Sequence, residues 1–222
     1  MLTHMSSDHP DGPLGQHTPA QVRYLARSTG WGDLLPELTT RMPAAALPTL
    51  DDAWAYACYH HGPQVRRDGR PFATHLAETV EFLLAGSPSP DPTAIVVALL
   101  HDLVEDTPVS LASIRQRYGL TVATAVANLT IVPAMPGTPR EAVRAAAFRR
   151  LRVAPAWVRQ IKLSDRLSTV QRIDCHPQLA KQVQRYHETL TYVVPLAAPF
   201  PWYAAQFALW RDAFRYLERA QP

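Results

Sequence analysis

Helical periodicity without a competing strand pattern is the feature that most limits what this chain can fold into. From Leu50 onward, apolar residues recur three and four positions apart in almost every segment. We find no segment with the apolar–polar alternation of a half-buried strand. Asp91-Pro92 supplies an N-cap and a first-turn proline for one helix, and Gly119 supplies a stop for another. The sequence therefore predicts an all-α helical bundle.

The expected helices follow from this punctuation. They cover about residues 51–61, 72–85, 110–118, 121–132, 156–173, 178–196 and 203–220. Another starts at Pro92 and holds the run "TAIVVALLHDLVE" as one continuous helix. A further helix begins at "TPRE", where Thr138 and Glu141 have the spacing of a capping box.

Composition divides the chain into three parts. Residues 1–18 are polar and rich in His, Pro and Gly, which predicts a disordered lead. Residues 19–49 are weakly helical, with a break at "STGWGD" and a linker-like "MPAAALP", so we expect a partly helical N-terminal extension. Residues 50–222 form the main domain, because 222 residues that are 47% hydrophobic suffice for one well-buried core.

Charge, cysteines and apolar runs narrow the setting. The net charge of +3 rests on arginines spread along the chain, so the pattern does not require a nucleic-acid groove. The two cysteines show no framework spacing, and the first residues contain no apolar signal-peptide core. No apolar run reaches the roughly 18 to 20 residues that span a bilayer. We therefore expect a cytoplasmic protein whose partner is neither nucleic acid nor a membrane.

The run "VALLHDLVEDTP" places four polar side chains, His101, Asp102, Glu105 and Asp106, at the end of an apolar segment. On a continuous helix, His101 and Asp102 diverge by about 100°, and the two acids four positions later return to the same two faces. A buried carboxylate is strongly disfavoured unless it is paired or bound to a cation, which favours a metal ion. The alternative is a solvated helix end with a structurally satisfied histidine.

Two other segments carry further ligand-type side chains. "PFATHLAETVEFLL" places His75 on an amphipathic helix, and "IKLSDRLSTV" places Asp165 in a helix that otherwise faces a core. Taken singly, each has an ordinary interpretation, a structural histidine in one case and an ion pair with Arg166 in the other. Together with His101 and Asp102 they supply two imidazoles and two carboxylates. This set suits Mn²⁺, Fe²⁺, Zn²⁺ or Mg²⁺, with positions left open for water.

Such a site has a definite chemistry. A metal ion held in this way lowers the pKa of a bound water and binds a phosphoryl oxygen, as the hydrolysis of a phosphate ester or anhydride requires. Glu105 and Asp106 lie beyond the ligands, where a carboxylate can orient that water or move its proton.

The order of His75, His101-Asp102 and Asp165 resembles the HD superfamily of metal-dependent phosphohydrolases. The runs "QVRRDGRPFATHLAETV", "ALLHDLVEDTPVSLASIRQRYG" and "IKLSDRLSTV" resemble the hydrolase domain of the RelA/SpoT family, which removes pyrophosphate from the 3′ position of (p)ppGpp. The resemblance covers about residues 51–192. It implies an HD-type helical bundle over residues 50–222 and a guanosine-3′,5′-bis(diphosphate) 3′-pyrophosphohydrolase that forms GDP or GTP, a small alarmone hydrolase like the metazoan SpoT homologue.

The resemblance also implies roles for individual residues. The family's metal ion, usually one Mn²⁺, would be held by His75, His101, Asp102 and Asp165, and its catalytic acidic pair would be Glu105 and Asp106. Its substrate contacts would fall on Arg66, Arg67, Arg140 and Tyr186. Arginine suits phosphates and bases, and a helix start such as that at Arg140 attracts anions. A solvated basic loop at Arg66 and Arg67, and core packing of Tyr186, are the alternatives.

One position near the site departs from the family. Where the family has "KLADRLHNM", this chain has "KLSDRLSTV", so Thr169 replaces an asparagine four residues after Asp165. In the family that position contacts substrate, so base or sugar specificity stays open. Adenine alarmone (ppApp 3′-pyrophosphohydrolase activity) and NADPH (2′-phosphatase activity) are therefore alternatives to ppGpp. An inactive nucleotide-binding regulator is a third possibility, which the retained ligands and acidic pair disfavour.

The resemblance also bears on partners. It implies a small-molecule nucleotide substrate, and it leaves open whether the enzyme clears alarmone alone or neutralises a cognate toxic alarmone synthetase. The aromatic-rich "PFPWYAAQFALWRDAFRYL" is either a homo-oligomer face or, as is more common for such spacing, a core helix.

Overall fold

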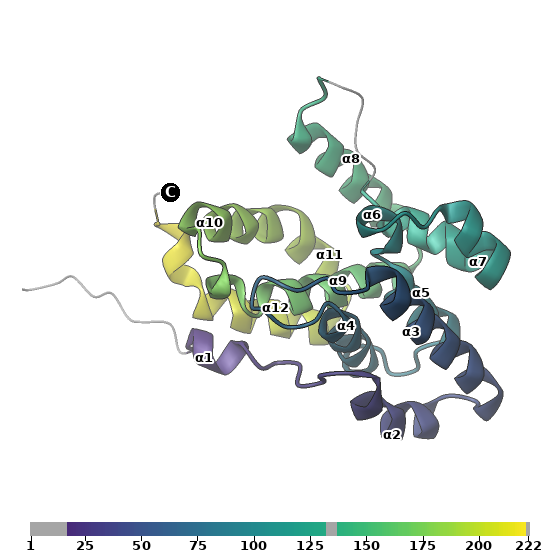
Figure 1. The fold of residues 1–222 in the computed structure, drawn as a ribbon. Coiled ribbons are helices and arrows are strands. Elements are labelled where there is room, and N and C mark those ends of the chain that lie inside the picture. Colours follow the sequence, from purple (N-terminus) through teal and green to yellow (C-terminus); the bar gives the residue numbers. More distant parts are fainter. Residues whose placement is uncertain (1–16, 132–136, 221–222) are drawn as a thin grey trace, which may run out of the picture.

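The computed structural model describes residues 17–131 and 137–220, and within them the chain is a bundle of helices without a β-sheet (Figure 1). The extended pairing among these residues is a single bridge between Val65 and Pro71. The prediction of an all-α fold is thus confirmed. The predicted disordered lead lies outside the described residues except for His17 and Thr18. No helix in the described part of the chain is long and apolar enough to cross a membrane.

The helices have the following bounds. They are α1 (Pro19–Val22), α2 (Trp31–Arg41), α3 (Leu47–His61), α4 (Ala73–Gly86), α5 (Pro92–Leu100), α6 (Leu103–Asp106), α7 (Leu111–Leu129), α8 (Arg140–Val153), α9 (Ala156–Val170), α10 (Leu179–Glu188), α11 (Val194–Ala197) and α12 (Pro201–Ala213). The shorter turns are η1 (Ala44–Ala46), η2 (Ile173–Cys175), the π-helical η3 (Thr189–Val193) and η4 (Arg215–Glu218).

Helices α4 and α9 pack along each other at the centre of the bundle (Figure 1). Helix α5 packs against both, and α3 covers α5. Every residue of α5 from Ala94 to Leu100 is buried, which explains why the run is apolar on all sides. On the opposite side, α12 closes the core, where Trp210 donates from Nε1 to the Val170 carbonyl oxygen at 3.0 Å. The central pair α4 and α9 is therefore held from both sides.

The residues before α3 also join this core. Val22, Leu34 and Leu38 from α1 and α2 are buried in the same apolar cluster as α4 and α9. Arg41 donates to the carbonyl oxygens of Leu84 at 2.6 Å and Ser87 at 2.7 Å, at the C-terminal end of α4. The segment predicted as an N-terminal extension is thus packed against the main bundle.

Several helix ends differ from the predicted ones. Asp91 caps α5 as expected, with its carboxylate accepting from the Thr93 amide at 2.7 Å. Gly119 interrupts α7 with a φ of 88°, a conformation that suits glycine. The capping box predicted at residues 138–141 is absent, because α8 begins after an extended Pro139 that makes no side-chain cap, and Glu141 accepts from the Tyr192 hydroxyl instead.

The predicted long C-terminal helices are also divided. The helix expected at 178–196 is split by the π-helical η3 into α10 and α11, and the one expected at 203–220 ends with α12 before η4. The helix expected at 156–173 ends at Val170, and the one expected at 121–132 ends at Leu129, with Val132 outside the described residues.

A more important difference lies between α5 and α6. The predicted helix through Glu105 is broken, since α5 ends at Leu100 and α6 begins at Leu103. His101 and Asp102 form the turn between them, with Asp102 at φ −95° and ψ −7°. On an unbroken helix these two side chains would diverge. The break lets both of them face the same point.

Candidate metal centre and cleft

The four predicted metal ligands converge from three parts of the fold. His75 comes from α4, His101 and Asp102 from the α5–α6 turn, and Asp165 from α9. One ligand atom from each lies within 4.8 Å of the others. The His75 Nε2 atom is 3.3 Å from both His101 Nε2 and Asp102 Oδ2. His101 Nε2 is 3.1 Å from Asp102 Oδ2, so the sequence brings together a compact set of nitrogen and oxygen donors.

The proton positions in this cluster favour a cation. His101 Nδ1 lies 2.8 Å from the Ala98 carbonyl oxygen, which can only accept, so Nδ1 carries the hydrogen. In the neutral ring, Nε2 then presents a lone pair toward the other three ligands. Two imidazole nitrogens and two carboxylate oxygens that face one point are satisfied by a divalent ion, and a backbone carbonyl on the outer nitrogen is the usual support of a metal-bound histidine. The residues present therefore fit a divalent metal ion.

Lys162 organises the fourth ligand. Its ammonium lies 2.7 Å from Asp165 Oδ2, which leaves Oδ1 to face His75 at 3.5 Å and His101 at 3.7 Å. Burial by itself raises the pKa of Asp165, but the adjacent Lys162 ammonium opposes burial most strongly, and the pKa lies well below its usual range. Asp165 is thus ionised and oriented before any ion binds.

The two acids of α6 lie beside the ligands. Partial burial raises the pKa values of both Glu105 and Asp106 above their usual range. Glu105 Oε1 accepts from the Ile131 amide at 2.7 Å, and the Asp106 carbonyl oxygen accepts from Gln64 Nε2 at 3.0 Å. Glu105 is thus held through its carboxylate and Asp106 through its backbone, and a raised pKa favours a carboxyl group that takes up and releases a proton.

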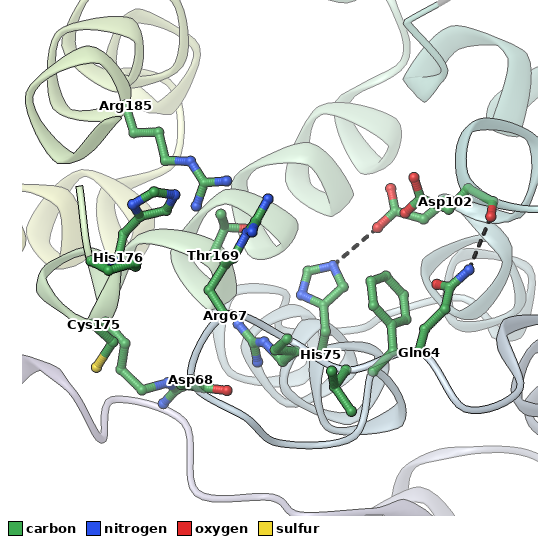
Figure 2. A pocket seen from close by; sticks show the side chains of 15 residues that line it. Gln64, Arg67, Asp68, His75, Asp102, Thr169, Cys175, His176 and Arg185 are labelled. Carbon is green, nitrogen blue, oxygen red and sulfur yellow. Dashed lines mark hydrogen bonds and ion pairs between the residues drawn. The ribbon is translucent and has the colours of Figure 1, made fainter. Parts of the chain in front are cut away.

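This cleft has two lobes that meet at Asp102. The first lobe has a volume of about 760 Å³ and is lined by His75 and Asp106, among others. The second has a volume of about 670 Å³ and is lined by Glu105 and Asp165. The residues common to both lobes are Arg67, Asp102, Thr169, His176, Pro177 and Arg185. Figure 2 shows Arg185 and His176 on the opposite side of the first lobe from Asp102. The metal ligands thus sit at the junction of the lobes, with one acid facing each.

Positive charge dominates the walls. Arg67 and Arg185 line both lobes, and the second lobe adds Arg144, Lys162, Arg166 and Lys181. Within residues 17–131 and 137–220, neither Arg67, Arg166 nor Arg185 forms an ion pair with a carboxylate. Such cations bind phosphate groups well. Arg144, Lys162, Arg185 and His176 were not predicted as site residues, and Arg166 was considered only as an ion-pair partner of Asp165. Helical spacing gives no signal that separates a cleft wall from a solvated face.

The predicted substrate residues fall in different places. Arg67 and Thr169 line both lobes, and the Thr169 hydroxyl lies 3.5 Å from Asp165 Oδ1. Arg66 lines the first lobe, but its guanidinium turns inward, with Nη1 2.5 Å from Glu78 Oε2.

The other two predicted contacts lie outside both lobes. Arg140 is the exposed first residue of α8, a helix that projects from the bundle in Figure 1, and it is Arg144 one turn later that reaches the cleft. Tyr186 is fully buried, and its hydroxyl donates to Glu218 at 2.9 Å.

Comparison with known proteins matches this arrangement to a family. The chain matches the HD domain over residues 53–200. It is 30% identical over 171 residues to the GTP pyrophosphokinase rsh of Brucella ovis, an alignment covering 76% of this chain and 22% of that protein. It is 31% identical over 205 residues to the putative GTP diphosphokinase RSH1, chloroplastic, of Oryza sativa subsp. japonica, covering 87% of this chain and 22% of that protein. The chain therefore spans 22% of the length of these relatives.

Solved structures agree on the fold. One described as a metazoan ortholog of SpoT that hydrolyzes ppGpp and plays a role in starvation responses has a TM-score of 0.64 at 21% identity, covering 79% of this chain and 97% of that one. The structure of lmo0812 from Listeria monocytogenes EGD-e has a TM-score of 0.51 at 19% identity, covering 66% of this chain and 98% of that one. With the four ligands in one cluster and the family match across most of the bundle, this chain belongs to the HD-domain family and is RelA/SpoT-like.

Proposed function

We propose that this chain is a metal-dependent phosphohydrolase that removes the 3′-pyrophosphate of (p)ppGpp, with Mn²⁺ as its ion. The observation that carries the proposal is the position of the ligand cluster, at the junction of two lobes. The walls of both lobes carry Arg67 and Arg185, which form no ion pair with a carboxylate of the described residues. The SpoT ortholog among its structural neighbours is described as hydrolysing ppGpp, which supports the same substrate here.

The shape of the cleft suits a nucleotide with phosphates at two positions. A pyrophosphate at the junction would lie beside Lys162, Arg67 and Arg185. The second lobe offers Arg144 and Arg166 for a separate 5′-phosphate chain, and the first lobe offers the ring of Phe72 for a base. A substrate with one phosphate group would leave part of this positive charge unused.

The residues at the junction account for the chemistry. A bound divalent ion lowers the pKa of a coordinated water and polarises a phosphoryl oxygen. In the proposed reaction the water oxygen bonds to phosphorus as the P–O bond to the 3′-oxygen breaks, and Glu105 and Asp106 accept the proton of the water and protonate the leaving oxygen. Asp106 lines the first lobe and Glu105 lines the second, so each lobe offers one acid for this proton transfer.

The test is product formation from ppGpp, ppApp and NADPH side by side, with Mn²⁺ and then with EDTA, followed by separation of the nucleotides. The proposal predicts pyrophosphate and GDP from ppGpp with Mn²⁺ and no product with EDTA. Asp102→Ala serves as the control for a contaminating hydrolase, because it removes a ligand. Failure of the wild-type protein to cleave ppGpp in Mn²⁺ would reject the proposal.

Thr169 favours a second candidate, a related nucleotide phosphohydrolase that acts on ppApp or NADPH. Its side chain lines both lobes next to Asp165, and a hydroxyl offers a base or sugar different hydrogen bonds from those of the family's amide. Cleavage of ppApp or NADPH in preference to ppGpp would select this candidate. Thr169→Asn would then be expected to shift preference toward ppGpp.

A further inference from the structure

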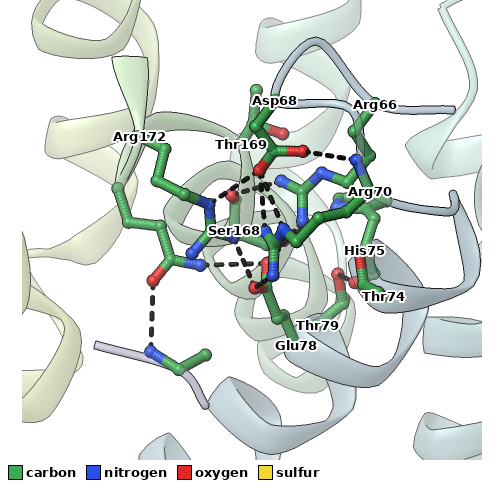
Figure 3. A network of polar contacts seen from close by, with 12 residues as sticks. Arg66, Asp68, Arg70, Thr74, His75, Glu78, Thr79, Ser168, Thr169 and Arg172 are labelled. Carbon is green, nitrogen blue, oxygen red and sulfur yellow. Dashed lines mark hydrogen bonds and ion pairs between the residues drawn. The ribbon is translucent and has the colours of Figure 1, made fainter. Parts of the chain in front are cut away.

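Glu78 is a fully buried carboxylate that the proposed reaction does not use. It lies on α4 three residues after His75 and has 0% of its surface exposed. Its Oε2 atom accepts from Arg66 at 2.5 Å, Ser168 at 2.7 Å and Gln171 at 2.9 Å. Its Oε1 atom accepts from Arg70 at 2.9 Å and from Arg172. Figure 3 shows Arg66, Arg70, Arg172 and Ser168 gathered around Glu78.

The charge around Glu78 keeps it ionised. Burial raises its pKa, but Arg66 and Arg172 outweigh burial and leave the pKa below its usual value. An ionised carboxylate has lone pairs and no proton to give. In each of its contacts Glu78 therefore acts as the acceptor.

This fixes the direction of the hydrogen bond to Ser168. A serine hydroxyl has one hydrogen, and it must point at Glu78 Oε2, which cannot donate. The Ser168 oxygen is then an acceptor for His75 Nδ1, 2.8 Å away. His75 consequently carries its hydrogen on Nδ1 and a lone pair on Nε2, the atom that faces Asp102 and His101.

We propose that Ser168 and Glu78 are positioning residues, which set the tautomer and orientation of His75 and so preform the metal site. The inference rests on the metal centre of the proposed function but not on its substrate. Arg66 and Arg70, from the loop that carries Arg67 into the cleft, bind the same carboxylate. One buried group thereby anchors both the substrate-facing loop and a metal ligand. Hydrogen-bond partners of this kind change metal affinity typically by 10- to 100-fold when they are removed.

Ser164 provides a matched control for Ser168. Both serines lie on α9 one turn apart, and both have 0% exposure. The Ser164 hydroxyl bonds to the Gln160 carbonyl oxygen at 3.0 Å and to the Tyr203 hydroxyl at 2.8 Å, away from the ligands. Ser164→Ala and Ser168→Ala thus each remove a buried hydroxyl from the same helix, but only the second breaks the link to His75.

The experiment is a calorimetric titration of the metal-free full chain with Mn²⁺ and no nucleotide. Ser168→Ala is expected to bind Mn²⁺ about 10- to 100-fold more weakly than the wild type, as loss of such a partner does elsewhere. Ser164→Ala is expected to bind like the wild type. Equal weakening by both variants would mean that a general loss of packing is responsible, and unchanged affinity in Ser168→Ala would overturn the proposal.

A second measurement needs no variant. Nitrogen-15 NMR of the histidine rings in the metal-free wild type in alkaline solution is expected to show the hydrogen of His75 on Nδ1. A hydrogen on Nε2 would overturn the proposal even if Ser168→Ala fails to fold. Because neither measurement uses a substrate, a wild type that hydrolyses no alarmone but passes both tests would reject the proposed function and leave this inference standing.

Discussion

Two buried clusters of charge lie side by side between α4 and α9, and they are built in opposite ways. Around Glu78 and Asp68, three guanidiniums, those of Arg66, Arg70 and Arg172, form ion pairs with the two carboxylates. Around Asp102 and Asp165, Lys162 supplies an ammonium, and the Nε2 atoms of both histidines face the carboxylates. The carboxylates of the first cluster find their cations within the protein, whereas we propose that the second cluster takes a further cation from solution. The two clusters occupy neighbouring positions in the fold, and they differ in the balance between cationic donors and carboxylate acceptors.

Removing a ligand should break the second cluster most severely. Asp102→Ala is expected to reduce both Mn²⁺ binding and hydrolysis to background. The variant loses an oxygen ligand that lies 3.3 Å from His75 Nε2 and 3.1 Å from His101 Nε2. Metal content after dialysis, together with product formation, checks this. A variant that retained the ion and the activity would remove Asp102 from the site.

The acids of α6 should separate metal binding from turnover. Glu105→Gln and Asp106→Asn keep size and shape but cannot transfer a proton, so hydrolysis is expected to fall about 10²- to 10⁴-fold while the ion stays bound. Initial rates on the metal-loaded variants are the measurement. If either variant lost the ion but worked normally once reloaded, that acid would belong with the ligands instead.

The first cluster should reveal itself through stability and acid sensitivity. The pKa of Glu78 is raised by burial but lowered further by the arginines, so its net value lies below that in the unfolded chain. Its contribution to stability is then fully present above the unfolded value of about 4.3 and is lost as the pH falls through the folded value. Glu78→Gln should therefore be less stable at pH 7, by about 3 kcal/mol or more, because it leaves buried guanidiniums unbalanced.

Urea unfolding from pH 7 to pH 3 measures this. The wild type is expected to lose stability as the solution becomes acidic, and Glu78→Gln should show a flatter dependence on pH. Parallel curves for the two proteins would show that Glu78 is not part of the acid response.

The smallest expected effect belongs to the cleft wall. Arg67→Ala should raise KM about 10-fold with little change in kcat, as the loss of a charged hydrogen bond to bound substrate does. Arg140→Ala is the comparison, because its side chain lies outside both lobes, and its kinetics should match the wild type. Steady-state kinetics of both variants on ppGpp are the measurement. A loss of kcat in Arg67→Ala would mean that Arg67 takes part in the chemical step.

The sequence was sufficient for the helical fold and for naming the four residues that the fold brings into one cluster, because periodicity reports burial and the motifs have distinctive spacing. It could not predict the turn at His101 and Asp102, since the apolar pattern continues through the break and no proline or glycine marks it. The convergence of these two neighbours is a tertiary effect. The sequence could predict that His101 and Asp102 belong to one site, but it could not predict the turn that lets both side chains face the same point.

The arginines show a different limit. Arg66 and Arg67 are adjacent in a loop without periodicity, and only the folded chain shows that one turns toward Glu78 while the other lines both lobes. Tyr186 poses the same problem on a helix, because a buried face and a cleft face have the same spacing. Its hydroxyl bonds to Glu218 from η4, a partner 32 positions away in sequence.

The central claim is that the cluster of His75, His101, Asp102 and Asp165 holds a divalent ion through both histidines. Pulsed electron paramagnetic resonance of the Mn²⁺-loaded full chain tests it directly, because nitrogen couplings count the imidazoles on the ion. The account predicts one Mn²⁺ per chain with two coordinated imidazole nitrogens. An ion that shows no nitrogen coupling would contradict it, and so would a chain that binds no Mn²⁺.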